Sequence, residues 1–274
     1  MRTGWPGRRR YLYPGRSWQP NNIRYRPEKR KKGWAAGRRG RRGEMERAVR
    51  FIERIPRTPQ VNSYRFVRPD GFFFQAGQYA IVGLGHEGLL VHPLSLSSVP
   101  HQDFLEFTKR MTGSAYSQYL EGLYPGDEVI VKGPNGNFSM TGIANDIVCL
   151  VAGIGLTPIL SMLIDAAYRN DRRRITLIYG NADDDDVPFA DELEELPLPH
   201  FRVVHVLRRS LGKIRACQGR IDTKVIRSEM DVDLQDATFL ISGSPVMVRE
   251  MEGQLALLGV SSSRIRLERL LGYI

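Results

Sequence analysis

The chain has 274 residues, of which 42% are hydrophobic, so it is long enough for two domains with separate cores. Its two cysteines exclude a disulfide framework and an iron–sulfur cluster held by four thiolates, which favours a reducing compartment. No stretch reaches the roughly 18 uninterrupted apolar residues of a membrane span, and the start lacks the apolar core of a secretory signal. We therefore expect a cytoplasmic protein without an integral membrane span.

The net charge of +10 comes from one end of the chain. Residues 1–44 hold fifteen Lys and Arg against two Glu, which leaves the remaining residues slightly negative. This segment lacks periodicity and is rich in Arg, Gly, Pro and aromatic residues, so we expect a disordered basic tail. It could bind RNA or an anionic membrane, or dock an acidic protein. It could equally be a leader that is not translated, with Met45 as the true start.

Residues 45–142 show a pattern typical of short strands separated by Pro- and Gly-containing turns. The expected strands are residues 48–55, 63–69, 78–84, 93–98, 104–110 and 128–134. One short helix is expected at residues 115–123. Six such strands predict a small antiparallel β-barrel domain.

From residue 143 to residue 274 the pattern changes, because apolar strands now alternate with helical stretches. The expected strands are residues 147–153, 174–180, 201–207 and 237–243, and apolar residues recur at helical spacing in 157–168 and 245–258. This alternation predicts a Rossmann-like parallel sheet. The fold class is therefore α/β, with a barrel first and a doubly wound domain second.

Two strands of the second domain run into glycine turns followed by helices. In LVAGIGLTPILSML, Gly153 and Gly155 would let a ligand approach the backbone closely, although a tight turn can also need glycine for steric reasons alone. In FLISGSPVMVREM, Ser244 is the expected N-cap and Pro245 the first helical residue. Two such loops at the carboxyl ends of parallel strands predict a crevice of the kind that binds nucleotides.

In this order the motifs HPLSLSS, TKRMTGSAYS, GPNGNF, GIGLTP, YGN and SGSPVMV resemble the ferredoxin–NADP reductase superfamily of flavin reductases, over essentially all of residues 46–274. The His-Pro-x-Ser form of the first motif is most similar to the dehydrogenase domains of ferric reductases and NADPH oxidases. The resemblance implies an FAD-binding barrel, a domain that binds NAD(P)H, and hydride transfer from the nicotinamide to FAD.

For the flavin, the resemblance implies that Ser95 hydrogen-bonds the reactive ring nitrogen, that Leu94 lies against the ring, and that His92 sits near the diphosphate. The other residues implied here are Pro93, Thr108, Lys109, Gly113, Ser114 and Ser117. The residues alone leave open a surface histidine at position 92 and serines that face solvent on an edge strand.

For the nicotinamide coenzyme, the resemblance implies that Ser242 stands where relatives carry a cysteine and donates a hydrogen bond near the nicotinamide. Glu268 would orient the nicotinamide or relay protons, and Tyr273 would stack over the flavin; a solvated strand residue and a frayed end are the alternatives. The binding residues implied here are Gly153, Gly155, Thr157, Pro158, Gly243, Pro245 and Met247.

The choice between NADH and NADPH is open at the sequence level. Arg208 and Arg209 sit where relatives place cations for the 2′-phosphate. The acidic run at residues 183–186 would repel a phosphate if it faced the site, or it could be a solvated loop. The histidines show no metal-ligand spacing with cysteines or carboxylates.

The first functional hypothesis is an FAD-dependent oxidoreductase that passes electrons to a ferredoxin, a flavodoxin, or a haem or oxygenase component. The alternative is an FAD-binding electron-transfer or regulatory subunit of a larger complex that docks through its tail. A third hypothesis is an enzyme that reduces free acceptors such as ferric chelates or oxygen. Nucleic-acid binding is expected only through the tail.

Overall fold

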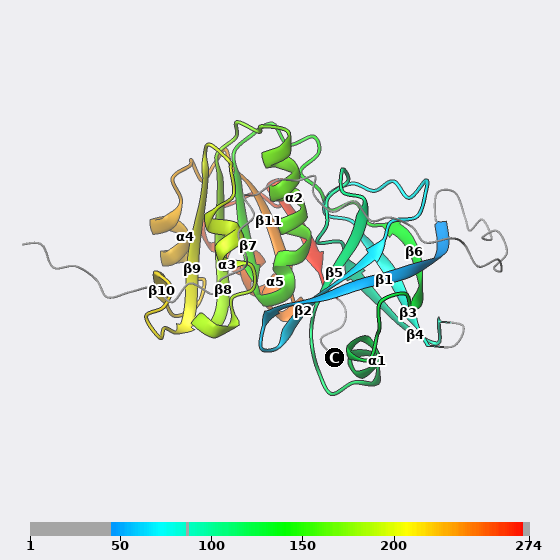
Figure 1. Cartoon of the computed structure of the whole chain (residues 1–274). Helices are drawn as coiled ribbons and strands as arrows, with labels where there is room; N and C mark the ends of the chain where they lie inside the picture. The colour runs from blue at the N-terminus through cyan, green and yellow to red at the C-terminus, as the bar shows by residue number, and fades with distance from the viewer. Residues whose placement is uncertain (1–44, 86–87, 271–274) are drawn as a thin grey trace, which may run out of the picture. The chain divides into compact units, whose positions relative to one another are not determined.

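The computed structural model describes residues 45–85 and 88–270, which form two six-stranded sheets joined by short connections (Figure 1). The predicted basic tail at residues 1–44 and Tyr273 lie outside the described residues. The first sheet lies within residues 45–135 and the second within residues 147–269.

The first sheet is antiparallel, in the order β4-β3-β6-β1-β2-β5. Its strands are β1 Met45–Thr58, β2 Val61–Val67, β3 Tyr79–Leu84, β4 Leu90–Ser95, β5 Phe104–Arg110 and β6 Glu128–Asn135. A bridge between Leu96 and Phe107 joins the chain after β4 to β5 and closes the sheet into a barrel. The helix α1 Ala115–Glu121 follows β5. The predicted antiparallel barrel and its short helix are confirmed.

The barrel core consists of side chains from alternate strand positions, as the two-residue period of a strand requires. Phe51, Phe66 and Phe107 pack ring against ring, with centroids 5.5 Å and 6.0 Å apart along the series. On β5, Leu105 and Phe107 point into this core, so Glu106, Thr108 and Arg110 face the other way. That outer face of β5 is turned toward elements of the second sheet.

The second sheet is entirely parallel, in the order β10-β9-β8-β7-β11-β12. Its strands are β7 Ile147–Ala152, β8 Ile175–Asp183, β9 Phe201–Arg209, β10 Ala216–Gln218, β11 Thr238–Gly243 and β12 Ile265–Arg269. The chain moves from β7 outward through β8 and β9, then returns to the other side of β7 with β11. This doubly wound topology confirms the predicted Rossmann-like domain.

Helices cover both faces of the parallel sheet, because residues on its strands are apolar on both sides. The helices α2 Leu156–Tyr168 and α3 Ala190–Glu194 pack on one face with Cys149 and Val151 of β7. The helices α4 Thr223–Glu229 and α5 Pro245–Leu257 pack on the other face with Val148 and Leu150. The predicted cap of α5 is confirmed, since the Ser244 side chain accepts a hydrogen bond from the backbone N–H of Met247.

Two features of the fold differ from the sequence-based expectation. The strand expected at residues 93–98 ends at Ser95, because Ser97 and Ser98 leave the β3 ladder and hydrogen-bond Glu106 of β5. Strand β10 and helix α4 were not expected; they have only three and seven residues, too few to show a clear period.

Candidate functional site

The topology creates a crevice at the carboxyl ends of β7 and β11. The chain leaves these two neighbouring strands in opposite directions along the sheet, so the loops after them diverge and leave the strand ends uncovered. Helix α2 begins after the turn Gly153–Gly155, and helix α5 begins after Ser244. The free backbone N–H groups at the start of each helix are therefore directed toward this crevice.

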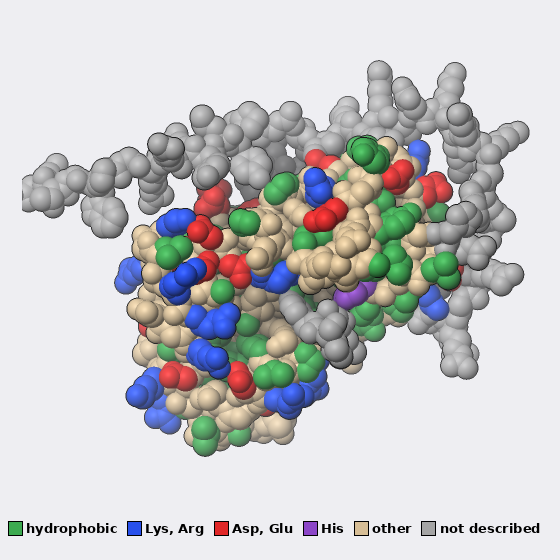
Figure 2. Space-filling view, turned by 90° about the horizontal axis from the view of Figure 1, so that it is seen from below, with side chains coloured by type: hydrophobic (Ala, Val, Ile, Leu, Met, Phe, Trp, Pro, Cys, Tyr) green, Lys and Arg blue, Asp and Glu red, His purple; other side chains and the backbone are tan. Residues whose placement is uncertain are grey.

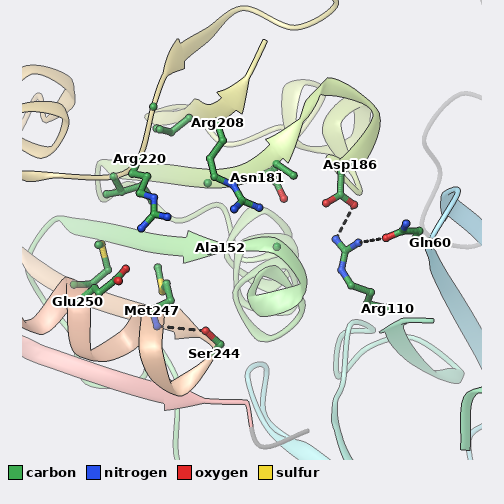
Figure 3. Close-up of a pocket in the computed structure, with 17 residues that line it drawn as sticks. Gln60, Arg110, Ala152, Asn181, Asp186, Arg208, Arg220, Ser244, Met247 and Glu250 are labelled. Atoms are coloured by element: carbon green, nitrogen blue, oxygen red, sulfur yellow. Dashed lines mark hydrogen bonds and ion pairs between the residues drawn. The ribbon is translucent and has the colours of Figure 1, made fainter. Parts of the chain in front are cut away.

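A cavity of about 590 Å³ occupies this end of the parallel sheet, and we call it the sheet cavity (Figure 3). Most of its wall comes from the ends of β7, β8 and β9 and from the start of α5. Its lining residues are Gln60, Arg110, Ala152, Gly153, Gly180, Asn181, Ala182, Asp186, Val206, Arg208, Gly219, Arg220, Ile221, Ser244, Met247, Glu250 and Met251.

Two arginines give the sheet cavity a cationic wall. Arg208 of β9 and Arg220 after β10 lie in the cavity, and neither has a hydrogen-bond or ion-pair partner among the described residues (Figure 3). Arg209, the other arginine expected here, lies outside the cavity lining and pairs with Asp183, at 2.7 Å between Nη2 and Oδ2. Lys and Arg side chains also gather on the parallel-sheet side of the face drawn in Figure 2. The cavity can therefore attract an anion.

A second cavity, of about 730 Å³, lies against the barrel, and we call it the barrel cavity. It is bounded by β4, β5 and the start of α1, and by the turn into α2. Its lining residues are His92, Pro93, Leu94, Ser95, Thr108, Lys109, Arg110, Thr112, Ser114, Tyr116, Ile154, Thr157 and Leu270. Eight of the residues implied by the family resemblance are among them: His92, Pro93, Leu94, Ser95, Thr108, Lys109, Ser114 and Thr157.

The barrel cavity combines apolar walls with hydrogen-bond donors. Ser95 and Leu94 are each 7% exposed, so these side chains face the interior and not solvent. The Lys109 Nζ donates to Ser117 Oγ at 3.2 Å, and burial lowers the pKa of this lysine. The ring of His92 lies 5.1 Å from the ring of Tyr116, centroid to centroid. The cavity therefore suits a ligand with a flat ring and polar edges.

The two cavities meet at the turn after β7. Gly153 lines the sheet cavity, and the next residue, Ile154, lines the barrel cavity. Arg110, at the end of β5, lines both. A Cβ added at Gly153 would meet nothing within 4 Å, so the backbone here is open to a ligand. Ligands in the two cavities would consequently approach each other at this turn.

Several residues that the family resemblance implies lie outside both cavity linings. Gly113 is one of them, and Ser117 is fully buried, accepting from Lys109 and from the Thr112 backbone N–H. The others are Gly155, Pro158, Arg209, Ser242, Gly243, Pro245 and Glu268. Their expected roles stay predictions.

Gly155 is explained by packing alone, because the backbone of β11 leaves no room for a side chain at this position. A Cβ at this position would lie 2.3 Å from the carbonyl oxygen of Ser242 and 2.8 Å from the Cα of Gly243. Both neighbours are backbone atoms, so they cannot move aside cheaply. Gly155 therefore lets the start of α2 pack directly against the end of β11.

Ser242 and Glu268 are neighbours on the parallel strands β11 and β12. The Ser242 Oγ is fully buried and has no hydrogen-bond partner among the described residues. Burial raises the pKa of Glu268 from its ordinary value near 4.5 to about 7. This corner of the sheet thus holds an unused hydroxyl beside a carboxyl group that can gain or lose a proton near neutral pH.

The acidic run is neither a solvated loop nor a uniform wall of negative charge. Asp184 is 7% exposed and accepts hydrogen bonds from the backbone N–H groups of Leu211, Lys213 and Ile214. Burial alone would raise the pKa of Asp184, but these hydrogen bonds lower it below its ordinary value. Of the four aspartates, only Asp186 is in the sheet cavity lining, where it pairs with Arg110.

Sequence reasoning missed Arg110, Tyr116 and Arg220 as lining residues. Arg110 follows Lys109 within the quoted TKRMTGSAYS motif, so strand alternation could have placed its side chain beside that of Thr108. Arg220 had no such signal, because it lies in an irregular segment after a three-residue strand.

In the described part of the chain, no group of three or more His, Cys, Asp and Glu side chains could hold a metal ion. None of the helices in that part is long and apolar enough to cross a membrane.

Residues 149–253 match the family model of the oxidoreductase NAD-binding domain. NADH-cytochrome b5 reductase 1 of Dictyostelium discoideum is 31% identical over 156 residues, which cover 55% of this chain and 54% of that protein. The chain spans about half the length of such curated relatives.

Two solved structures share the fold. A ferredoxin NADP+ reductase from Neisseria gonorrhoeae, with bound FAD and NADP, has a TM-score of 0.74 at 21% identity, covering 82% of this chain and 99% of its own. The FAD/NAD-binding domain of nitric oxide dioxygenase from Vibrio cholerae has a TM-score of 0.73 at 24% identity, covering 81% and 98%. The chain therefore has the fold of these two structures, and its residues 149–253 match the oxidoreductase NAD-binding domain.

Proposed function

We propose that the chain is an NAD(P)H-dependent flavin oxidoreductase that binds FAD in the barrel cavity and the nicotinamide coenzyme in the sheet cavity. The observation that carries this proposal is the meeting of the two cavities at Gly153 and Ile154. Hydride transfer needs the two reacting rings in contact and shielded from water, and two ligands that meet at one turn of the chain satisfy this requirement.

The residues that line the barrel cavity suit FAD. Ser95, Thr112 and Ser114 offer hydroxyl groups around the barrel cavity, Lys109 offers a cation for a diphosphate, and Leu94 offers an apolar wall for a ring. Bound FAD would accept hydride from the reduced nicotinamide and release electrons to an acceptor.

Ser242 and Glu268, on the strands β11 and β12, support the same proposal. The Ser242 hydroxyl is buried and has no hydrogen-bond partner among the described residues, so a hydrogen bond to a ligand at the turn would satisfy it. The Glu268 carboxyl, with a pKa near 7, can hold a proton at rest and release it near neutral pH.

We further propose that the electron acceptor is a protein, namely a ferredoxin, a flavodoxin, or a haem or oxygenase component. The similar proteins support this choice, since one is named for cytochrome b5 and another for ferredoxin. The cytoplasmic location expected from the sequence is part of the same proposal.

Anaerobic stopped-flow absorbance tests the reaction. The FAD-loaded chain is mixed separately with NADH and NADPH, and the flavin bands are followed. We expect rapid bleaching with at least one coenzyme. A yellow protein that neither coenzyme bleaches would favour a flavin-binding subunit without reductase activity, and a chain that FAD cannot reconstitute would exclude the flavin proposal altogether.

A further inference from the structure

Arg110 is the residue whose surroundings the proposed function leaves unexplained. It is the last residue of β5 and shares the outer face of that strand with Glu106 and Thr108. Its side chain crosses from the barrel to the second sheet, where its Nη2 lies 2.6 Å from the Asp186 Oδ1. Its Nη1 donates to the Gln60 Oε1 at 2.9 Å. All three side chains line the sheet cavity (Figure 3).

The ion pair between Arg110 and Asp186 is accessible to a ligand. The two side chains are 21% and 23% exposed, and both belong to the wall of the cavity. An ion pair in contact with solvent is weak, since water screens its charges. An incoming dianion that offers two or more oxygens to the guanidinium can therefore replace the single carboxylate.

We propose that Arg110 binds the diphosphate of the dinucleotide, and that Asp186 holds this guanidinium in the free protein. Coenzyme binding then exchanges one anion on Arg110 for another, so Asp186 is a built-in competitor that weakens binding. This inference rests on the proposed function and adds a binding residue and an affinity-setting contact to it.

The geometry of the cavity places Arg110 where a diphosphate would lie. Arg208 and Arg220 reach the cavity from the parallel sheet, and Arg110 reaches it from the barrel side (Figure 3). A dinucleotide with its nicotinamide at Gly153 and its adenosine end near Arg208 carries its diphosphate between them. Arg110 also lines the barrel cavity, so it marks the boundary between the two ligands.

Isothermal titration calorimetry of the FAD-loaded chain with ADP-ribose tests the exchange, because this probe has the diphosphate but no nicotinamide. We expect Asp186→Asn to lower the Kd about fivefold, since the competitor is removed, and Arg110→Gln to raise it about fivefold or more. In the Arg110→Gln background, Asp186→Asn should have no further effect. If Asp186→Asn tightens binding equally in that background, the aspartate acts by general repulsion and the exchange is wrong.

Glu192→Gln is the matched control. Glu192 of α3 pairs with Arg57 of β1 at 2.7 Å, which also links the barrel to the second sheet, but neither residue lines either cavity. We expect its Kd for ADP-ribose to equal that of the unchanged chain. Equal tightening by Glu192→Gln and Asp186→Asn would mean that looser contact between barrel and sheet, and not anion exchange, changes the affinity.

The result for the unchanged chain separates this inference from the proposed function. Measurable binding of ADP-ribose without any effect of Asp186→Asn overturns the inference alone. Failure of the unchanged chain to bind ADP-ribose, NAD⁺ and NADP⁺ overturns both.

Discussion

At the scale of single residues, the partners of each charged side chain decide which charges a ligand can use. Arg208 and Arg209 are adjacent in sequence, yet Arg209 pairs with Asp183, whereas Arg208 in the sheet cavity has no partner among the described residues. Arg220, from a different segment, supplies a second guanidinium that is unpaired within the described part of the chain. The cationic wall is thus built by Arg208 and Arg220, and not by the adjacent pair that the sequence suggested.

Replacing these two arginines should reveal which coenzyme the wall serves. We expect Arg208→Gln and Arg220→Gln each to raise the KM for NADPH about tenfold, with little change for NADH, because only NADPH carries a 2′-phosphate. Steady-state oxidation of both coenzymes with ferricyanide as acceptor measures this. An equal loss with NADH would show that the arginines bind a group common to both coenzymes.

Glu268 predicts a pH dependence of stability. Its pKa is raised from about 4.5 to about 7 by burial, so the folded chain binds more protons than the unfolded chain between these values. The carboxyl group therefore destabilises the fold as the pH rises from 4.5 to 7. We expect Glu268→Gln to raise the free energy of unfolding by about 1 kcal/mol at pH 8 and to leave it nearly unchanged at pH 4.

Urea denaturation of both proteins across this pH range checks the prediction. A difference that does not change with pH would mean that the substitution acts through packing and not through the proton.

At the scale of elements, a buried ion network joins strands that the sequence does not bring together. Glu106 of β5 is 4% exposed and contacts Arg65 of β2 and Arg57 of β1, at 2.8 Å and 3.4 Å, and its Oε1 accepts from Ser97. Arg57 continues the network to Glu192 of α3. The network on the outer face of the barrel therefore reaches α3 through one ion pair.

Removal of the Glu106 carboxylate should destabilise the fold strongly. We expect Glu106→Leu to lower the free energy of unfolding by about 3 kcal/mol, because it leaves two partly buried guanidinium groups without their shared partner. Glu53→Gln is the control, since Glu53 pairs with Arg65 from a side chain that is 44% exposed and should contribute less than about 1 kcal/mol. Thermal unfolding by circular dichroism compares the two; equal losses would contradict the network's central role.

The sequence predicted elements better than contacts. Strong apolar periods identified most strands and the long helices α2 and α5, and the glycine turns after β7 and β11 located the crevice. The pairing of Arg110 with Asp186 could not be predicted, since these residues are 76 positions apart and their meeting depends on how the barrel packs on the sheet. The end of β4 was misjudged because Ser97 and Ser98 bond to Glu106, a contact between side chains and a different strand.

At the scale of the whole molecule, the residues that line the two cavities come from a long range of the sequence, from Gln60 to Leu270. The seam between barrel and sheet is polar as well as apolar: the Ser161 hydroxyl donates to the Ser98 carbonyl at 2.6 Å, and the ring of His101 stacks on that of Tyr168 at 3.8 Å. The site residues thus depend on this seam.

Deletion of residues 1–44 tests whether the basic segment contributes to flavin reduction. We expect the chain of residues 45–274 to be reduced by NAD(P)H at the same rate as the full chain in stopped-flow experiments, because every described lining residue is retained. Binding to RNA, anionic vesicles or an acidic protein, measured in parallel, would be lost if the basic segment is responsible for it. A slower flavin reduction would place part of the catalytic site in the deleted segment.

The close packing of Gly155 against Ser242 and Gly243 has a consequence for how such a chain can evolve. The start of α2 packs on the end of β11 through backbone atoms, and among the lining side chains Thr157 adds one hydrogen bond to the turn that separates the two cavities, at the Ile154 carbonyl. Substitutions in those side chains can retune the coenzyme or the acceptor while the spacing between the two ligands is inherited unchanged. This arrangement permits the lining residues to diversify while the distance between the two bound ligands stays constant.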